Sequence, residues 1–239
     1  HIFCAYTESC HQNTPAQTLG GGKLCAKTRH RSAFAGRLRQ HQREGGRVGV
    51  WGGGRLNKVS TWFTSDTHFG HANIIQYCNR PYTSLSEMDD VLVTNWNQIV
   101  RPNDMVYHLG DFTLGGEKEA APYFARLNGR ISILPGGHDK GWLSKDEYTS
   151  KSGHSIVILP PLVTIKLQIP GLSQSQIIVL CHYAMRVWDR SHYGSWQLYG
   201  HSHCNLPQHL KSLDVGVDCW DYCPVSLEQV TEEMGKVSM

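Results

Sequence analysis

The chain has 239 residues, of which 40% are hydrophobic and 18% charged, and this composition suffices to bury a sizeable core in one large domain or two small ones. No apolar run approaches the roughly 18 residues of a membrane span, and the N-terminus lacks the charged start and apolar stretch of a secretory signal. These features argue against membrane-spanning and secreted proteins, so we expect a soluble, cytoplasmic protein with no membrane partner.

Residues 1–58 form a basic, glycine-rich segment. It carries ten Lys or Arg residues against Glu8 and Glu44, whereas the rest of the chain has 13 basic and 18 acidic residues. Few large apolar side chains are present to offset the entropy of ordering, so we expect a disordered arm, with a short helix over 32–42. Such an arm is typical of segments that bind nucleic-acid phosphates. The alternative is a leader or linker with no selected role.

A folded α/β domain is predicted over residues 59–239. Runs rich in β-branched and aromatic residues predict strands at 59–65, 104–110, 130–135, 155–159, 162–169, 176–182, 196–200 and 212–217. Helices fit at 71–79, 86–100, 116–128 and 226–234, and two of them follow Ser-x-x-Glu or Ser-x-x-Gln starts, at Ser84 and Ser226. This order of elements favours either one mixed sheet or a pair of packed sheets.

Five of the predicted strands end in Asp or His. The residues at these ends are Asp66, His68, Asp111, His138, Asp139, His182, His201 and His203. In open α/β sheets, sites form outside the carboxyl ends of the strands, where loops bring distant residues together. The repeated pattern therefore predicts a single convergent cluster.

A mixture of carboxylates and imidazoles suits Zn²⁺, Mn²⁺ or Fe better than Ca²⁺. Residues i and i+2 of an extended segment point to the same side, so Asp66 with His68, and His201 with His203, can each offer two ligands to one place. These ligands are too many for one tetrahedral ion. Two divalent ions about 3.5–4 Å apart that share one carboxylate would use them all.

The segments SDTHFGH, HLGDF, PGGHD, CHY and GHSH, in this order, resemble the calcineurin-like metallophosphoesterases, and SDTHFGHANII with CNRP is similar to the small bacterial and phage members. The resemblance runs from about Thr61 to the C-terminus. It implies a double β-sheet sandwich flanked by helices, with a two-metal site. The implied ligands are Asp66, His68 and His203 for one metal and His182 and His201 for the other, with Asp111 bridging them.

The chain departs from the family pattern at Gly137, where the family has an Asn that completes the shell of the second metal. Glycine has no side chain to coordinate with, so the second ion would rest on three residues and on solvent or substrate. We therefore expect weaker binding of that ion and a lower rate. A neighbour such as His71 or Asn73 is an alternative source of the ligand.

The expected activity is hydrolysis of a phosphomonoester or phosphodiester by metal-activated water. His138 would act as general acid or steady the phosphoryl charge, and Asp139 would orient its ring. His71 and Arg80 are candidates to contact phosphate, although Arg80 is equally typical of an ion pair. Small phosphorylated substrates such as nucleotides or cyclic phosphodiesters are expected. The alternatives are a degenerate relative that binds without turnover and a nucleic-acid binder that acts through the arm.

Overall fold

The computed structural model describes residues 59–143 and 147–237. The basic arm predicted over 1–58, with its short helix, lies outside the described residues. Among the described residues, no helix is long and apolar enough to cross a membrane.

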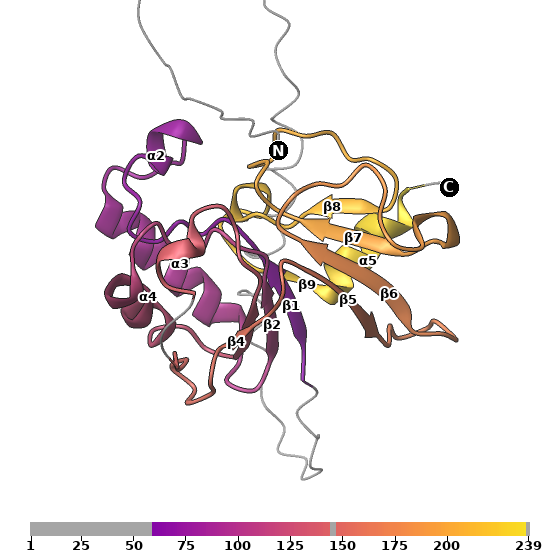
Figure 1. Cartoon of the computed structure of the whole chain (residues 1–239), viewed down its shortest axis with the longest axis horizontal. Coiled ribbons are helices and arrows are strands. Elements are labelled where there is room, and N and C mark those ends of the chain that lie inside the picture. Colours follow the sequence, from indigo (N-terminus) through magenta and orange to yellow (C-terminus); the bar gives the residue numbers. More distant parts are fainter. Residues whose placement is uncertain (1–58, 144–146, 238–239) are drawn as a thin grey trace, which may run out of the picture. The chain divides into compact units, whose positions relative to one another are not determined.

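Two mixed β-sheets form the centre of the described domain (Figure 1). The first has the order β4-β3-β2-β1-β9 and is parallel except for β9, which runs antiparallel to β1. Its strands are β1 (Thr61–Thr64), β2 (Met105–His108), β3 (Arg130–Ile133), β4 (Val157–Ile158) and β9 (Val225–Ser226).

The second sheet has the order β5-β6-β7-β8, in which β5 runs antiparallel to β6 and the other pairs are parallel. Its strands are β5 (Leu162–Leu167), β6 (Gln176–Cys181), β7 (Trp196–Tyr199) and β8 (Ser212–Asp214). In both sheets, the parallel strands end at a common edge, so the loops that follow them are brought together.

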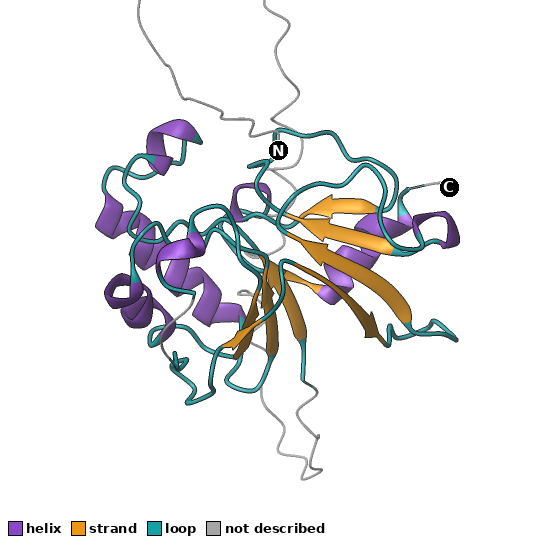
Figure 2. Cartoon of the chain, viewed as in Figure 1, coloured by secondary structure: helices purple, strands orange, loops and turns teal. Residues whose placement is uncertain are grey.

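Helices flank the sheets (Figure 2). The α-helices α2, α3 and α4 lie beside the first sheet, on the side away from the second, and α5 contacts β1, β8 and β9. Their bounds are α2 (Ile74–Tyr77), α3 (Leu85–Ile99), α4 (Glu117–Phe124) and α5 (Leu227–Gly235), and the short 3₁₀ helices are η1 (Asp139–Gly141), η2 (Ser191–Tyr193) and η3 (Val217–Cys219).

The first sheet is covered on both faces. Trp62 packs with a core cluster formed by helices α3 and α4, whereas its neighbour Phe63 belongs to a second cluster with Leu180 and Leu198 of the other sheet. Successive side chains of a strand point to opposite faces, so each short strand contributes to both clusters.

The predicted α/β architecture with two packed sheets is confirmed. Each of the eight predicted strands is present, most of them shortened at one or both ends, and the helix predicted over 71–79 covers only 74–77. Both predicted caps are present, since Ser84 Oγ accepts from Glu87 N–H at 3.2 Å and Ser226 forms a complete capping box with Gln229. Strand β9 was missed because two residues are too few to show a strand period.

Candidate metal centre

The loops after four strands bring the six predicted ligands to one place. One ligand atom from each residue of a set lies within 4.8 Å of the others, and the sets are Asp66, His68 and His203, and Asp111, His182 and His201. These are the two sets that the family resemblance implied. A third set, formed by His68, Asp111 and His138, overlaps both, so the cluster is continuous.

Asp111 lies at the centre of the cluster. Its Oδ2 is 3.3 Å from Nε2 of His182, 3.7 Å from Nε2 of His68 and 3.9 Å from Nε2 of His138. Its Oδ1 accepts a hydrogen bond from the backbone N–H of His138 at 2.9 Å. One buried carboxylate therefore faces imidazoles from both ligand sets, which is the geometry required of a bridging ligand.

Five of the six ligands have left-handed backbone conformations. Their φ angles are 58° for Asp66, 50° for His68, 54° for Asp111, 64° for His201 and 45° for His203. Residues with a side chain seldom adopt this region, and a cluster of them is typical of functional sites. The prediction that these side chains point to one side because their segments are extended was therefore wrong, because left-handed turns direct them. His201 and His203 both lie in the cluster, in different sets.

A ladder of backbone hydrogen bonds joins the loop after β1 to the loop after β2 and holds the left-handed turns in place. The N–H groups of Asp66, His68 and Phe69 donate to the carbonyls of Gly110, Asp111 and Phe112 at 3.0, 3.0 and 2.8 Å. The parallel pairing of β1 with β2 thus continues past the ends of the strands into the ligand loops. The positions of Asp66, His68 and Asp111 are consequently fixed by backbone hydrogen bonds.

Asp139 does not orient the ring of His138 as predicted. Its buried carboxylate accepts from the N–H groups of Asp111, Phe112 and Gly136 at 2.7, 2.9 and 2.7 Å, and from the indole N–H of Trp142 at 3.2 Å. Asp139 therefore ties the glycine loop to the Asp111 loop, and its acceptor capacity is used in doing so.

Arg80 is a supporting residue and not the phosphate contact that was considered. It is 4% exposed, and it donates to both carboxylate oxygens of Asp218 at 2.9 Å and to the carbonyls of Asp66 and Thr67 at 2.7 and 3.0 Å. Asp218 in turn contacts Nδ1 of His203 at 2.7 Å. Sequence reasoning missed this role of Asp218, because nothing in its local pattern reveals a partner 15 residues away.

In His203 and His182, one ring nitrogen makes a supporting contact and the other is left for the site. Nδ1 of His203 contacts Asp218, and Nδ1 of His182 lies 2.8 Å from the carbonyl of Leu109. Such outer contacts fix the orientation of the ring and leave Nε2 to face the site. The backbone N–H of His201 donates to Asp66 Oδ2 at 2.9 Å, so the two ligand sets are also joined directly.

The inward-facing atoms fit a divalent cation. Asp66 Oδ1 and His68 Nε2 are buried and have no hydrogen-bond partner within residues 59–143 and 147–237. Buried polar atoms without a partner are costly, and carboxylate oxygens and imidazole nitrogens are ligands for Zn²⁺, Mn²⁺ and Fe. The donor set therefore matches the metal centre that the sequence predicts.

The electrostatics of the cluster reflect crowded carboxylates and imidazoles. Burial raises the pKa of Asp66 to about 7, against the opposing effect of the nearby His182 and His203. Burial also acts on Asp111, but contacts with His182, His138 N–H and His68 outweigh it and the pKa of Asp111 is lowered. Burial opposes the charge on His203 as well, yet the contact with Asp218 raises its pKa to about 10.

His71 and His138 lie at the edge of the cluster. The ring centroids of His68 and His71 are 5.5 Å apart, and those of His71 and His138 are 6.0 Å apart. The side chain of His138 is 43% exposed, so it can reach both the cluster and solvent. Burial lowers the pKa of His71, which favours its neutral form. Both residues are therefore placed to contact a molecule that binds next to the metal-ligand side chains.

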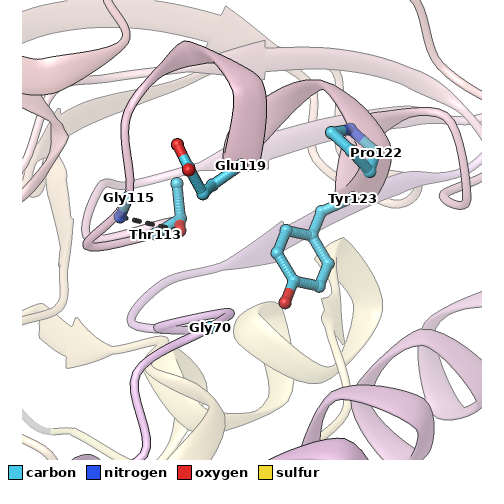
Figure 3. A pocket seen from close by; sticks show the side chains of 6 residues that line it. All are labelled: Gly70, Thr113, Gly115, Glu119, Pro122 and Tyr123. Atoms are coloured by element: carbon cyan, nitrogen blue, oxygen red, sulfur yellow. Dashed lines mark hydrogen bonds between the residues drawn. The ribbon is translucent and has the colours of Figure 1, made fainter.

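A separate pocket lies at the far end of the two ligand loops (Figure 3). It is lined by Gly70, Thr113, Gly115, Glu119, Pro122 and Tyr123. The Thr113 hydroxyl accepts from Gly115 N–H and donates to the carbonyl of Phe69, so this polar group holds the loops together. The carboxylate of Glu119 would repel an anion, and we do not assign this pocket to a phosphate group.

The raised pKa of Asp66 leads to a pH dependence of metal binding. Below about pH 7, a divalent ion must displace the Asp66 proton as well as the proton of His203, whose pKa is about 10. Affinity for Mn²⁺ should fall as the pH is lowered, by about tenfold per pH unit for each displaced proton. Titration calorimetry in two buffers of different ionisation enthalpy should show more protons released at pH 6 than at pH 8. Equal release at both pH values would contradict the assignment of Asp66.

The contact between Asp218 and His203 can be tested by Asp218→Asn. This substitution removes the charge that orients His203 and neutralises Arg80, so the affinity for one ion should fall by about 10- to 100-fold. Competition with a chromogenic chelator measures the change, and Asp189→Asn, at an exposed position, is the matched control. Unchanged affinity in Asp218→Asn would show that the contact does not support the metal centre.

Comparison with known proteins identifies the family of this chain. The family model described as calcineurin-like phosphoesterase matches residues 59–205. The chain is 34% identical over 188 residues to the uncharacterized protein MJ1445 of Methanocaldococcus jannaschii, covering 74% of this chain and 93% of that protein. It is 26% identical over 182 residues to the Gene 66 protein of Mycobacterium phage L5, covering 67% of this chain and 87% of the phage protein.

A solved structure shares the fold. The crystal structure of AQ665, a protein of unknown function from Aquifex aeolicus, has a TM-score of 0.55 and 23% sequence identity, and the match covers 74% of this chain and all of that one. The matched family segment contains the six candidate ligands, which the two mixed sheets bring together. The chain belongs to the calcineurin-like phosphoesterase family.

Proposed function

We propose that this chain is a metal-dependent hydrolase that cleaves a phosphomonoester or phosphodiester at a centre holding two divalent ions. The observation that carries the proposal is the position of Asp111. It belongs to the set with His182 and His201, and its Oδ2 lies 3.3–3.9 Å from Nε2 of His182, His68 and His138. One tetrahedral ion could not use both sets, because together they offer six ligand atoms. Mn²⁺, Zn²⁺ and Fe are the candidate metals.

Held by these residues, two divalent ions would supply charge that polarises a phosphoryl group and lowers the pKa of a bound water molecule. The chain's own contribution is to fix six ligands in place before substrate arrives. The ladder between the Asp66 and Asp111 loops and the contacts of His203 and His182 with Asp218 and Leu109 accomplish this. Ligands fixed in this way need no rearrangement during the reaction.

His138 is the proposed general acid. Its ring is next to His68 and Asp111, while its side chain stays 43% exposed, so it can pass a proton to a leaving oxygen at the mouth of the site. Its backbone N–H donates to Asp111 Oδ1, which fixes the distance between the acid and the bridging carboxylate. His71, 6.0 Å from the His138 ring, is proposed to contact the substrate phosphate.

The proposed substrate is a small phosphorylated molecule, such as a nucleotide or a cyclic phosphodiester. His71, His138 and His201 lie beside the candidate ligands, where we propose that they contact the phosphate of such a molecule. Nucleic-acid binding by residues 1–58 stays a prediction, since that segment lies outside the described residues.

A second candidate function is binding of metal or phosphate without turnover. Gly137 favours it, because the side chain that completes the second metal shell in the family is absent. The two functions differ in a single measurable respect, which is whether the metal-loaded chain turns over an ester.

Hydrolysis of aryl phosphate esters by the Mn²⁺-loaded chain tests the proposal. Both a monoester and a diester should be used, each with a 4-nitrophenyl and an unsubstituted phenyl leaving group. The wild-type chain should hydrolyse one ester class, and a chelator should abolish the activity. In His138→Ala, kcat should fall by roughly 100- to 10,000-fold for the phenyl ester and by less for the nitrophenyl ester, because a good leaving group needs less acid assistance.

His209→Ala is the matched control, since His209 is an exposed histidine outside the ligand sets, and its kcat should equal that of the wild type. Metal content should be measured on every sample. Loss of activity in His138→Ala that is the same for both leaving groups would contradict the general-acid role. If the wild type holds metal but turns over none of the esters, the binding-only function takes precedence.

A further inference from the structure

The two glycines of the PGGHD loop differ in what the structure requires of them. A Cβ at Gly136 would lie 2.2 Å from Asp111 Oδ1 and 2.3 Å from Asp111 N, so only glycine fits there. A Cβ at Gly137 would lie 3.4 Å from the Tyr183 hydroxyl and 3.9 Å from Asp111 Oδ1, which are ordinary contact distances. The backbone therefore accepts a side chain at position 137. Lack of space does not explain why this position has no side chain to act as a metal ligand.

Tyr183 lies on the side of the site that position 137 faces. Its ring centroid is 4.8 Å from that of His182 and 4.8 Å from that of His201, and its hydroxyl is the atom nearest to the Cβ position of Gly137. The phenol thus borders the two histidines of the ligand set formed by Asp111, His182 and His201. A side chain that extended from position 137 would begin in contact with this hydroxyl.

The position of Tyr183 is fixed from the second sheet. Gln197 of β7, which is fully buried, donates through Nε2 to the carbonyl of Tyr183 at 2.9 Å and accepts at Oε1 from Met185 N–H at 3.1 Å. Yet Tyr183 is 49% exposed, so burial of its ring does not account for its orientation. Its ring lies against two ligand histidines, its hydroxyl lies beside position 137, and its backbone is anchored, which is the arrangement expected of a residue that serves the site.

We propose that the Tyr183 hydroxyl is the fourth protein ligand of the ion held by Asp111, His182 and His201, in place of the side chain that position 137 lacks. This inference rests on the proposed two-ion function and deepens it, since it names the residue that completes the coordination of the second ion. His71 is less suited to this role because its ring lies beside His68 and His138, in the neighbourhood of the other ligand set. Oxygen from tyrosine joins carboxylate and imidazole as a donor for Mn²⁺ or Fe.

The test compares metal binding in five proteins: wild type, Tyr183→Phe, Tyr193→Phe, Gly137→Asn and the double variant Tyr183→Phe with Gly137→Asn. Equilibrium dialysis against Mn²⁺ gives the number of ions and the affinity of each. In Tyr183→Phe, one of the two affinities should fall by about tenfold or more while the other stays unchanged. Tyr193, which is 80% exposed, is the matched control, and Tyr193→Phe should bind both ions as the wild type does.

The double variant shows whether the two positions serve one purpose. If Tyr183 replaces the side chain at 137, then Gly137→Asn should restore the affinity that Tyr183→Phe removes. Loading with Fe³⁺ adds a spectroscopic readout, because tyrosine oxygen bound to ferric iron gives a visible charge-transfer absorption. This absorption should be present in the wild type and in Tyr193→Phe, and absent in both proteins that lack Tyr183.

Two outcomes separate this inference from the proposed function. If the wild type binds two ions and hydrolyses an ester, but Tyr183→Phe binds both ions equally well and the wild type shows no ferric absorption, the role of Tyr183 is overturned and the hydrolase stands. If the wild type binds a single ion and hydrolyses no ester, the two-ion function fails and the inference fails with it.

Discussion

The whole site depends on the position of one carboxylate. Asp111 is 2% exposed, and its Oδ2 faces histidines from three loops, which follow β1, β3 and β6. The first two strands belong to one sheet and the third to the other, so Asp111 is where the two halves of the sandwich meet chemically. The backbone ladder with the Asp66 loop and the carboxylate of Asp139 hold the backbone of Asp111, and Asp111 Oδ1 in turn accepts from the N–H of His138.

The fold holds the ligands in conformations that they would not adopt alone. A residue forced into a left-handed or similarly sparse conformation costs about 1–3 kcal/mol, which is comparable with the gain from burying one large apolar side chain. Five ligands have such conformations, and they follow strands whose buried side chains, such as Phe63 and Leu109, join the cluster between the sheets. The core therefore supplies the rigidity that keeps the donor atoms directed at one place, and a bound cation would relieve the repulsion between them.

Much of the site could be predicted because strand ends are visible in sequence. Apolar runs that terminate in Asp or His identified the six ligands, and the common edge of parallel strands explains why Asp66 and Asp111 meet. The supporting residues could not be predicted in the same way. Asp139 binds three backbone N–H groups instead of His138, a choice that depends on how two loops pack and not on local pattern. The relation of Tyr183 to Gly137 gave no signal in the sequence, since it exists only in three dimensions.

The most direct test of this account is anomalous X-ray scattering from a crystal of the Mn²⁺-loaded chain. The account predicts two peaks about 3.5–4 Å apart with the carboxylate of Asp111 between them, one near Asp66, His68 and His203 and the other near His182 and His201. A single peak, or two peaks that do not share Asp111, would contradict the bridging role on which the account rests.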